Sequence, residues 1–231
     1  MKFFKFKKPT TKWLLLAGAT ILVIIGTVIA ISSCSRTSYF QLVLDNLSET
    51  RLYMKQGETD GYRVQFYAGM REDPYMVNGI SEKKVAFGIV NLEPHGKIDA
   101  EEIEGVLKIG EEPLPVTLER NPHGTNFACD IEKLPPVEKN LVLTLTIGSS
   151  TQVFNLTNVM PAEAINWERA LEIATDELLP QIKRADKFEC YVKIVNCPVK
   201  SGCSYWYVRF VPEKGDNFFV VIDAAGKIVN Q

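Results

Sequence analysis

The sequence contains little histidine and none of the short motifs that mark common enzymes. Only two histidines occur in 231 residues, His95 and His123, and each lies in a Pro-His-Gly segment. Pro-x-Gly is turn chemistry that leaves the ring in water. No Gly-x-Ser-x-Gly, P-loop or dinucleotide-binding fingerprint appears. We therefore expect no enzyme, no catalytic residue, no cofactor and no metal site. A hydrolase that uses a Ser–Lys or Glu pair in a cleft is the third hypothesis, which spacing alone does not test.

Acidic side chains are missing from the first 44 residues, and charge of either sign is missing from residues 13–31. Those 19 uncharged residues would span roughly 28 Å as a helix, close to the ~30 Å hydrocarbon core of a bilayer. Five lysines precede them: Lys2, Lys5, Lys7, Lys8 and Lys12. The positive-inside rule then predicts a cytoplasmic N-terminus and a bulk that lies outside the cell membrane. We expect residues 1–35 to be a lysine-rich tail and a membrane anchor or lipoprotein signal.

The end of the apolar run leaves two kinds of anchor open. Ile31-Ser32-Ser33-Cys34 resembles a bacterial lipobox, in which the cysteine receives a lipid. The length of residues 13–31 favours an uncleaved transmembrane helix instead. No Ala-x-Ala cleavage site follows, so a released protein is not expected. Either anchor, the helix or a lipid on Cys34, gives a tethered extracytoplasmic protein.

The rest of the chain is acidic. Because five of the 26 basic side chains lie in the first 12 residues, the remainder carries 21 basic against 28 acidic side chains, a net charge of −7. This charge argues against a nucleic-acid partner. Hydrophobic residues make up 46% of the chain, which is enough for a packed core.

Two domains are expected after a stalk and entry segment at residues 36–60. Residues 61–160 contain about seven short β patterns with turn residues between them, which is typical of an all-β, immunoglobulin-like sandwich. That label describes the architecture only, because the Cys…Trp…Cys signature is absent. Within this part, residues 71–75 form a compact charged segment that we expect to be a solvated turn.

Residues 161–231 predict a small α+β domain. Asn166 can cap a helix that begins at Trp167, and Pro180 should kink or end it. Strand patterns follow at residues 188–197, 204–211 and 218–223. One helix before an antiparallel sheet predicts that the helix covers one face of that sheet.

The same segment resembles the PepSY domain family. The residues that carry the resemblance are 170–174 (ALEIA), 205–210 (YWYVRF) and 220–228 (VVIDAAGKI). The resemblance covers residues 162–231 and implies a helix on a small antiparallel sheet. It also implies binding or inhibition rather than catalysis. Pro180 and the loop between Cys197 and Cys203 depart from the family pattern, and no catalytic residue carries over.

Cys197 and Cys203 flank a short loop between two of the predicted strands. An oxidising exterior permits a disulfide there, and two separate thiols are the alternative. If the two cysteines face each other, the register of the hairpin follows. One face then carries Cys190, Val192, Ile194, Trp206, Val208 and Phe210, which is an apolar core face.

The opposite face of that hairpin is aromatic and basic. It carries Tyr191, Lys193, Tyr205, Tyr207 and Arg209. These residues are candidates for gripping an extended peptide or a protein partner, and cross-strand pairing on a solvated face is the alternative. We therefore expect a non-catalytic envelope protein that binds or regulates a protein or peptide partner. The alternative is a structural spacer or subunit of an envelope assembly.

Overall fold

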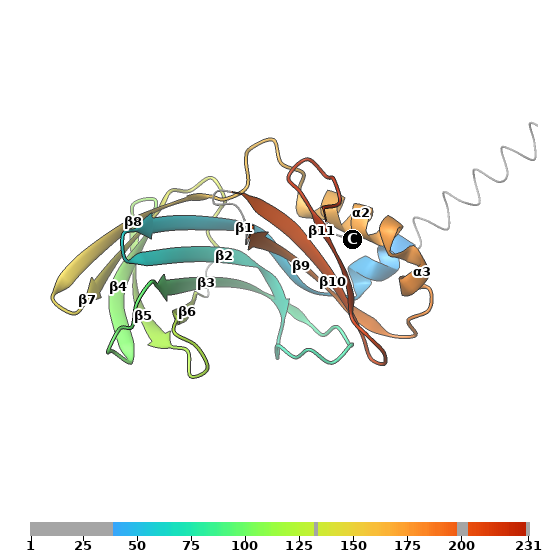
Figure 1. The fold of residues 1–231 in the computed structure, drawn as a ribbon, viewed down its shortest axis with the longest axis horizontal. Helices are drawn as coiled ribbons and strands as arrows, with labels where there is room; N and C mark the ends of the chain where they lie inside the picture. Colours follow the sequence, from blue (N-terminus) through green and yellow to red (C-terminus); the bar gives the residue numbers. More distant parts are fainter. Residues whose placement is uncertain (1–38, 132–133, 198–202, 230–231) are drawn as a thin grey trace, which may run out of the picture. The chain divides into compact units, whose positions relative to one another are not determined.

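The computed structural model describes residues 39–131, 134–197 and 203–229, and residues 43–231 form one compact unit. Within the described part, eight strands form a closed barrel with the order β1-β2-β3-β6-β5-β4-β7-β8 (Figure 1). Strand β8 returns to β1 through the pairs Lys55↔Asn158 and Gln56↔Thr157. The strands are β1 (Leu47–Thr59), β2 (Tyr62–Glu72), β3 (Lys84–Pro94), β4 (Glu102–Ile109), β5 (Glu112–Arg120), β6 (Phe127–Ile131), β7 (Leu141–Ile147) and β8 (Ser150–Asn158).

The prediction of a mostly β chain is confirmed, but the two-sheet sandwich is not what residues 61–160 form. Their strands join β1 in one closed sheet instead of two facing sheets. Alternating patterns such as Leu141, Leu143 and Leu145 pointing inward do bury one face of each strand. A sandwich and a barrel both produce this period of two, so the pattern alone could not distinguish them.

The inside of the barrel is a continuous apolar core. Side chains from β2, β3, β6 and β7 meet there, among them Phe66, Leu92, Phe127 and Leu143, all fully buried. The hairpin between β7 and β8 turns at Gly148, whose φ of +60° favours glycine. A turn this short joins two neighbouring antiparallel strands directly.

The stalk prediction for residues 36–60 is wrong for its second half. Residues 39–45 are helical, and Leu47–Thr59 is the longest strand of the sheet. Strand β1 pairs with β2, β8 and β9, which makes it the centre of the fold. Its mixed polar sequence concealed this role, because buried Glu49 and Lys55 interrupt the apolar pattern.

Within the described residues, the C-terminal part adds three strands to the same sheet and two helices that pack beside it. These are α2 (Trp167–Glu177), α3 (Leu179–Ile182), β9 (Phe188–Asn196), β10 (Ser204–Pro212) and β11 (Phe218–Ile222). As expected, the Asn166 side chain caps α2 by accepting from the Arg169 backbone N–H at 3.0 Å, and Pro180 opens a separate short helix. The helices lie on one face of β9, β10 and β11 (Figure 1).

Strand β9 runs parallel to β1, with Leu47 opposite Cys190. The antiparallel set β9-β10-β11 therefore extends the wall of the barrel as one sheet. Whether residues 61–160 and 161–231 are separable domains stays a prediction.

No helix in residues 39–131, 134–197 or 203–229 is long and apolar enough to cross a membrane. The predicted anchor at residues 13–31 and Cys34 lie outside the described residues.

Candidate functional site

The five residues of the predicted binding face lie on one side of β9 and β10, but they are not equally accessible. Lys193, Tyr205, Tyr207 and Arg209 are partly exposed, whereas Tyr191 is 2% exposed and lies beneath Tyr75. In the observed register Tyr191 is opposite Arg209, Lys193 is opposite Tyr207, and Tyr205 is opposite Val195. This is the pairing that the sequence predicted for the hairpin. We call Tyr191, Lys193, Tyr205, Tyr207 and Arg209 the tyrosine–arginine face.

The other side of the same strands is buried beneath helix α2. Val192, Val208 and Phe210 are completely buried, and α2 packs over this side. Trp206 is 3% exposed, and its indole Nε1–H donates to the Ile165 carbonyl at 3.0 Å. Because the helix occupies one side, a partner that docks on a face of this part of the sheet would meet the tyrosine–arginine face, in the part that Tyr75 leaves uncovered.

A buried carboxylate, Glu49, connects this face to the barrel. It stands on β1 opposite Tyr191 and is 4% exposed. Its oxygens accept from Lys193 Nζ at 2.6 Å, from Arg51 Nε at 3.0 Å and from the Tyr75 hydroxyl at 2.7 Å. Burial would raise the pKa of Glu49, but Lys193 and Arg51 outweigh burial and hold the pKa below its ordinary value. One carboxylate therefore fixes two cations and a tyrosine in place.

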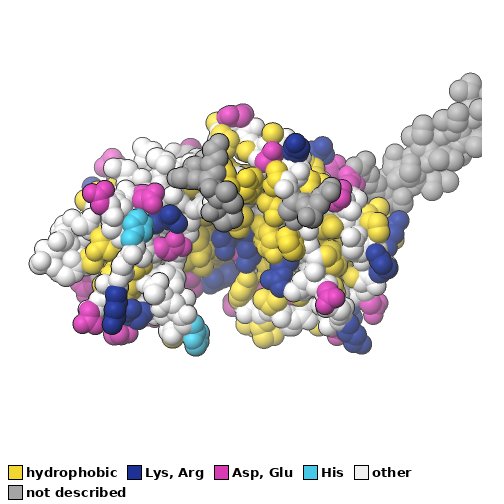
Figure 2. Space-filling model, in the orientation of Figure 1, with side chains coloured by type: hydrophobic (Ala, Val, Ile, Leu, Met, Phe, Trp, Pro, Cys, Tyr) yellow, Lys and Arg dark blue, Asp and Glu magenta, His cyan; other side chains and the backbone are white. Residues whose placement is uncertain are grey.

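Sequence reasoning missed the part of this site that comes from the barrel. Arg51 lies over the Tyr67 ring at 4.0 Å, and Arg71 lies over the Phe87 ring at 5.0 Å. Figure 2 shows Lys and Arg side chains in the hollow at the centre of that view. No local signal pointed to these residues, because they come from β1, β2 and β3 and meet β9 only through the pairing of β1 with β9.

The expectation of a solvated turn at residues 71–75 is confirmed for residues 73–75, which are exposed, and is wrong for Arg71 and Glu72, which end strand β2. Glu72 is 1% exposed, and its carboxylate accepts from the backbone N–H groups of Met76 at 3.3 Å and Glu82 at 3.1 Å. Tyr75 packs edge-on against Tyr191, with ring centroids 6.4 Å apart. The connection between β2 and β3 is thus held against the tyrosine–arginine face. Burial raises the pKa of Glu72 above its ordinary value, and its own hydrogen bonds oppose that rise.

An aromatic pair lies at the outer end of the face. The rings of Tyr207 and Phe219 have centroids 5.3 Å apart, and Phe219 is 48% exposed. Strand β11 places Phe219 directly opposite Arg209. An exposed ring pair beside a guanidinium is a composition that is enriched at protein interfaces.

The two cysteines of the predicted disulfide lie across the mouth of the β9–β10 hairpin. The Cys197 backbone N–H donates to the Cys203 carbonyl at 2.9 Å, and the Cys203 thiol donates to the Tyr205 hydroxyl at 3.7 Å. Hydrogen bonding to Cys197 and Cys203 raises the pKa of Tyr205 above its ordinary value. The disulfide itself stays a prediction that this arrangement is compatible with.

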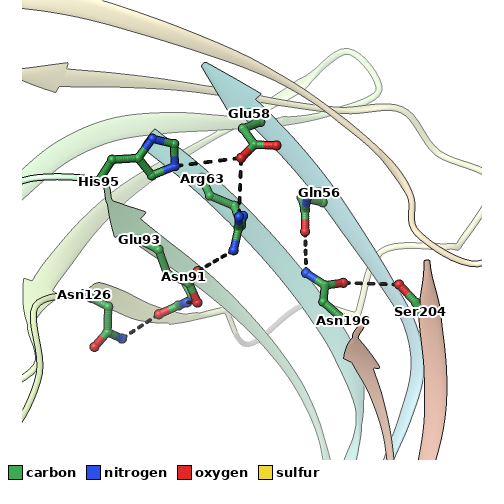
Figure 3. Close-up of polar contacts among 9 residues, drawn as sticks. All are labelled: Gln56, Glu58, Arg63, Asn91, Glu93, His95, Asn126, Asn196 and Ser204. Carbon is green, nitrogen blue, oxygen red and sulfur yellow. Dashed lines mark hydrogen bonds and ion pairs between the residues drawn. The ribbon is translucent and has the colours of Figure 1, made fainter. Parts of the chain in front are cut away.

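A second polar group lies on the outside of the barrel (Figure 3). His95 Nε2 is 3.8 Å from Glu58, and Arg63 joins Glu58 at 3.5 Å and Glu93 at 3.4 Å. The other contacts drawn there are amide and hydroxyl bonds among Gln56, Asn91, Asn126, Asn196 and Ser204. Glu58–Arg63, Arg63–Glu93 and Asn196–Ser204 are pairs of facing residues on neighbouring strands. Residues 39–131, 134–197 and 203–229 contain no cluster of three acidic, cysteine or histidine side chains that could hold a metal.

The space between β5 and β6 offers no reactive group. These strands pair only at Glu119↔Ala128 and Arg120↔Phe127 within the described ranges, and a cavity of about 410 Å³ lies beside residues 114–117 and 129–131. Burial raises the pKa of the Cys129 thiol there to about 11. The thiol is therefore protonated at neutral pH and is a poor nucleophile.

Comparisons with known proteins give no further guidance to the site. No family model matches the chain, and neither a curated protein nor a solved structure is similar to it. The function of the chain therefore has to be inferred from the geometry of the tyrosine–arginine face and its contacts.

Proposed function

We propose that the chain is a non-catalytic protein, tethered in the cell envelope, that binds a protein or peptide partner through its tyrosine–arginine face. One observation carries the proposal. The hairpin register turns Lys193, Tyr207 and Arg209 outward together, while α2 closes the opposite side. Tyrosine and arginine are among the residues enriched at binding hot spots, and Tyr205, Tyr207 and Arg209 keep partly exposed side chains on this side of the sheet.

The rigidity of the surface also supports binding. Glu49 holds Lys193, Arg51 and Tyr75 by charge-assisted hydrogen bonds. Side chains that are fixed before association lose less conformational entropy when a partner binds. The site therefore suits recognition by a preformed surface.

The location belongs to the same proposal. The lysines before residues 13–31, together with the apolar length of that segment, favour an N-terminus in the cytoplasm and a bulk outside. The anchor is the helix or a lipid on Cys34. The resemblance of residues 162–231 to PepSY domains, which are associated with envelope proteins and with binding, agrees with this role.

Site-specific photocrosslinking tests the proposal in cells. The full chain carries p-benzoylphenylalanine in place of Tyr207 and, as a matched control, in place of exposed Lys108 on β4. We expect one dominant adduct with another protein at position 207 and none at position 108. Adducts only between copies of the chain would favour the structural spacer or assembly subunit. Equal labelling at both positions would refute a specific face.

Two further measurements test the location. Protease added to cells with an opened wall should digest the bulk of the chain, and protection of the bulk would refute the proposed topology. Mass analysis of the N-terminus distinguishes the anchors, because a lipid-modified Cys34 indicates a lipoprotein and an intact Met1 indicates a helix.

A further inference from the structure

More cationic than anionic side chains lie at and beside the tyrosine–arginine face. Lys193 and Arg209 belong to the face and Arg51 adjoins it, and two buried carboxylates, Glu49 and Glu189, lie beside them. Three cations against two anions leave a surplus of one positive charge. The chain beyond its first 12 residues has a net charge of −7, so this surplus is local and runs against the overall charge.

Arg209 is the cation that has no partner. The described residues offer it no hydrogen bond and no ion pair, although Arg51 and Lys193 both bind Glu49. Its diagonal neighbours across β9 and β10 are Lys193, a like charge, and Glu189, a fully buried carboxylate that accepts from the Ser48 hydroxyl at 3.2 Å. Burial lowers the pKa of Lys193; Glu49 opposes that effect, and Arg51 and Arg209 add to it. Arg209 therefore repels Lys193 in the isolated chain, and no hydrogen bond or ion pair among the described residues offsets that repulsion.

An apolar platform adjoins this unpaired guanidinium. Phe219 is opposite Arg209 on β11 and stacks obliquely on Tyr207 at 5.3 Å. A ligand that lies across β10 and β11 would meet a cation and two rings within one strand spacing, about 5 Å. This combination fits an acidic side chain next to an aromatic one.

We propose that the face binds an acidic peptide segment that carries an aromatic side chain, with a carboxylate on Arg209 and Lys193 and the ring on Tyr207 and Phe219. This inference rests on the proposed function and adds the chemistry of the partner. A planar guanidinium binds a carboxylate through two parallel hydrogen bonds. The surplus charge would then be neutralised by the partner, which explains why the free chain keeps a repulsive pair.

Binding of defined polymers to the full chain in detergent tests the inference. The probes are a random copolymer of glutamate and tyrosine, poly-L-lysine, polyphosphate and vesicles of anionic phospholipid. We expect the copolymer to bind, and poly-L-lysine not to bind. Arg209→Gln should weaken copolymer binding roughly ten- to hundredfold, as expected for a lost hydrogen bond between charged groups. Lys108→Gln removes the same charge from an exposed site on β4 and should leave binding unchanged.

Ionic strength and stability supply two independent readouts. Binding should weaken between about 0.01 M and 0.15 M salt, over which the screening length falls from roughly 30 Å to 8 Å. Arg209→Gln should leave the urea midpoint unchanged or raise it, because it removes a repulsive neighbour of Lys193. A lowered midpoint would mean that Arg209 is structural and would overturn the inference.

Other outcomes separate this inference from the proposed function. Polyphosphate or anionic vesicles that bind as tightly as the copolymer would overturn the peptide assignment. Crosslinking of a partner at position 207, with no copolymer binding, would leave the binding function standing and refute the acidic specificity. Copolymer binding that depends on Arg209, with no partner crosslinked at position 207, would support the anion site and refute the proposed function.

Discussion

Replacing Glu49 by glutamine should destabilise the protein more than any other conservative change on the tyrosine–arginine face. The carboxylate has a 5% exposed side chain and three partners, Lys193, Arg51 and Tyr75. Glutamine keeps the shape but removes the charge, so two largely covered cations lose their counterion. Breaking a buried ion pair costs about 3–5 kcal/mol. Because Lys193 and Arg51 have side chains that are 22% and 18% exposed, water can relieve part of that cost, and we expect about 2–4 kcal/mol.

Equilibrium unfolding in urea, followed by tryptophan fluorescence, measures this loss. The matched control is Glu58→Gln, which removes a contact of 3.5 Å to Arg63 between side chains that are 45% and 38% exposed. Exposed pairs of this kind contribute about 1 kcal/mol or less. A double-mutant cycle of Glu49→Gln with Lys193→Met should show a coupling energy of at least about 1 kcal/mol. Losses that are equal for Glu49→Gln and Glu58→Gln would refute the assignment of Glu49 as the centre of the network.

The same variant has a signature in pH dependence. The pKa of Glu49 is lower in the folded chain than its ordinary value of 4.5. Its contribution to stability is therefore present above that value and is lost as the pH falls through the folded pKa. The difference in unfolding free energy between wild type and Glu49→Gln should shrink on acidification. A difference that stays constant across that range would contradict the charged role.

Three further predictions follow from the fold. Trp206→Ala should cost about 3–5 kcal/mol in urea unfolding followed by circular dichroism, since the ring is buried and its N–H is bonded. Tyr207→Ala should cost much less because its side chain is partly exposed; the reverse order would mean that the binding face is the core. Non-reducing peptide mapping should find Cys197 linked to Cys203, and two alkylated thiols would exclude the disulfide. The pKa of Glu72 is raised in the folded chain, so its contribution to stability is lost as the pH rises through the folded pKa. Glu72→Gln should therefore flatten the decline of the urea midpoint with pH above about pH 4.5. An unchanged slope of urea midpoint against pH would refute this.

The sequence predicted much of the local structure of this chain. The patterns at residues 188–197 and 204–211 predicted strands, and the structure has β9 and β10 there. The capping Asn166 and the interrupting Pro180 act as their chemistry requires. The hairpin register also followed from the sequence once Cys197 was placed opposite Cys203, because one fixed pair sets the partner of every other residue in the two strands.

The sequence predicted only some residues of the candidate site. The five residues of the tyrosine–arginine face were predicted, since they belong to one hairpin. Glu49, which organises that face, was hidden in a segment taken for a stalk. A carboxylate in the middle of a strand pattern indicates a buried ion pair only when its counterions are known. Here the counterion Lys193 lies more than a hundred residues away in the sequence.

The sequence by itself determined most of the strands after residue 61, where helix α2 begins and which face of those strands is buried, because these depend on neighbours within a few positions. Only the tertiary structure decided that β8 returns to β1 to close a barrel and that β9 joins β1 in parallel. An alternating strand specifies that one face must be covered, but it does not specify what covers it. That choice depends on contacts between distant segments, and here such contacts made the central strand out of residues 47–59 and brought one buried carboxylate to the face we propose for binding.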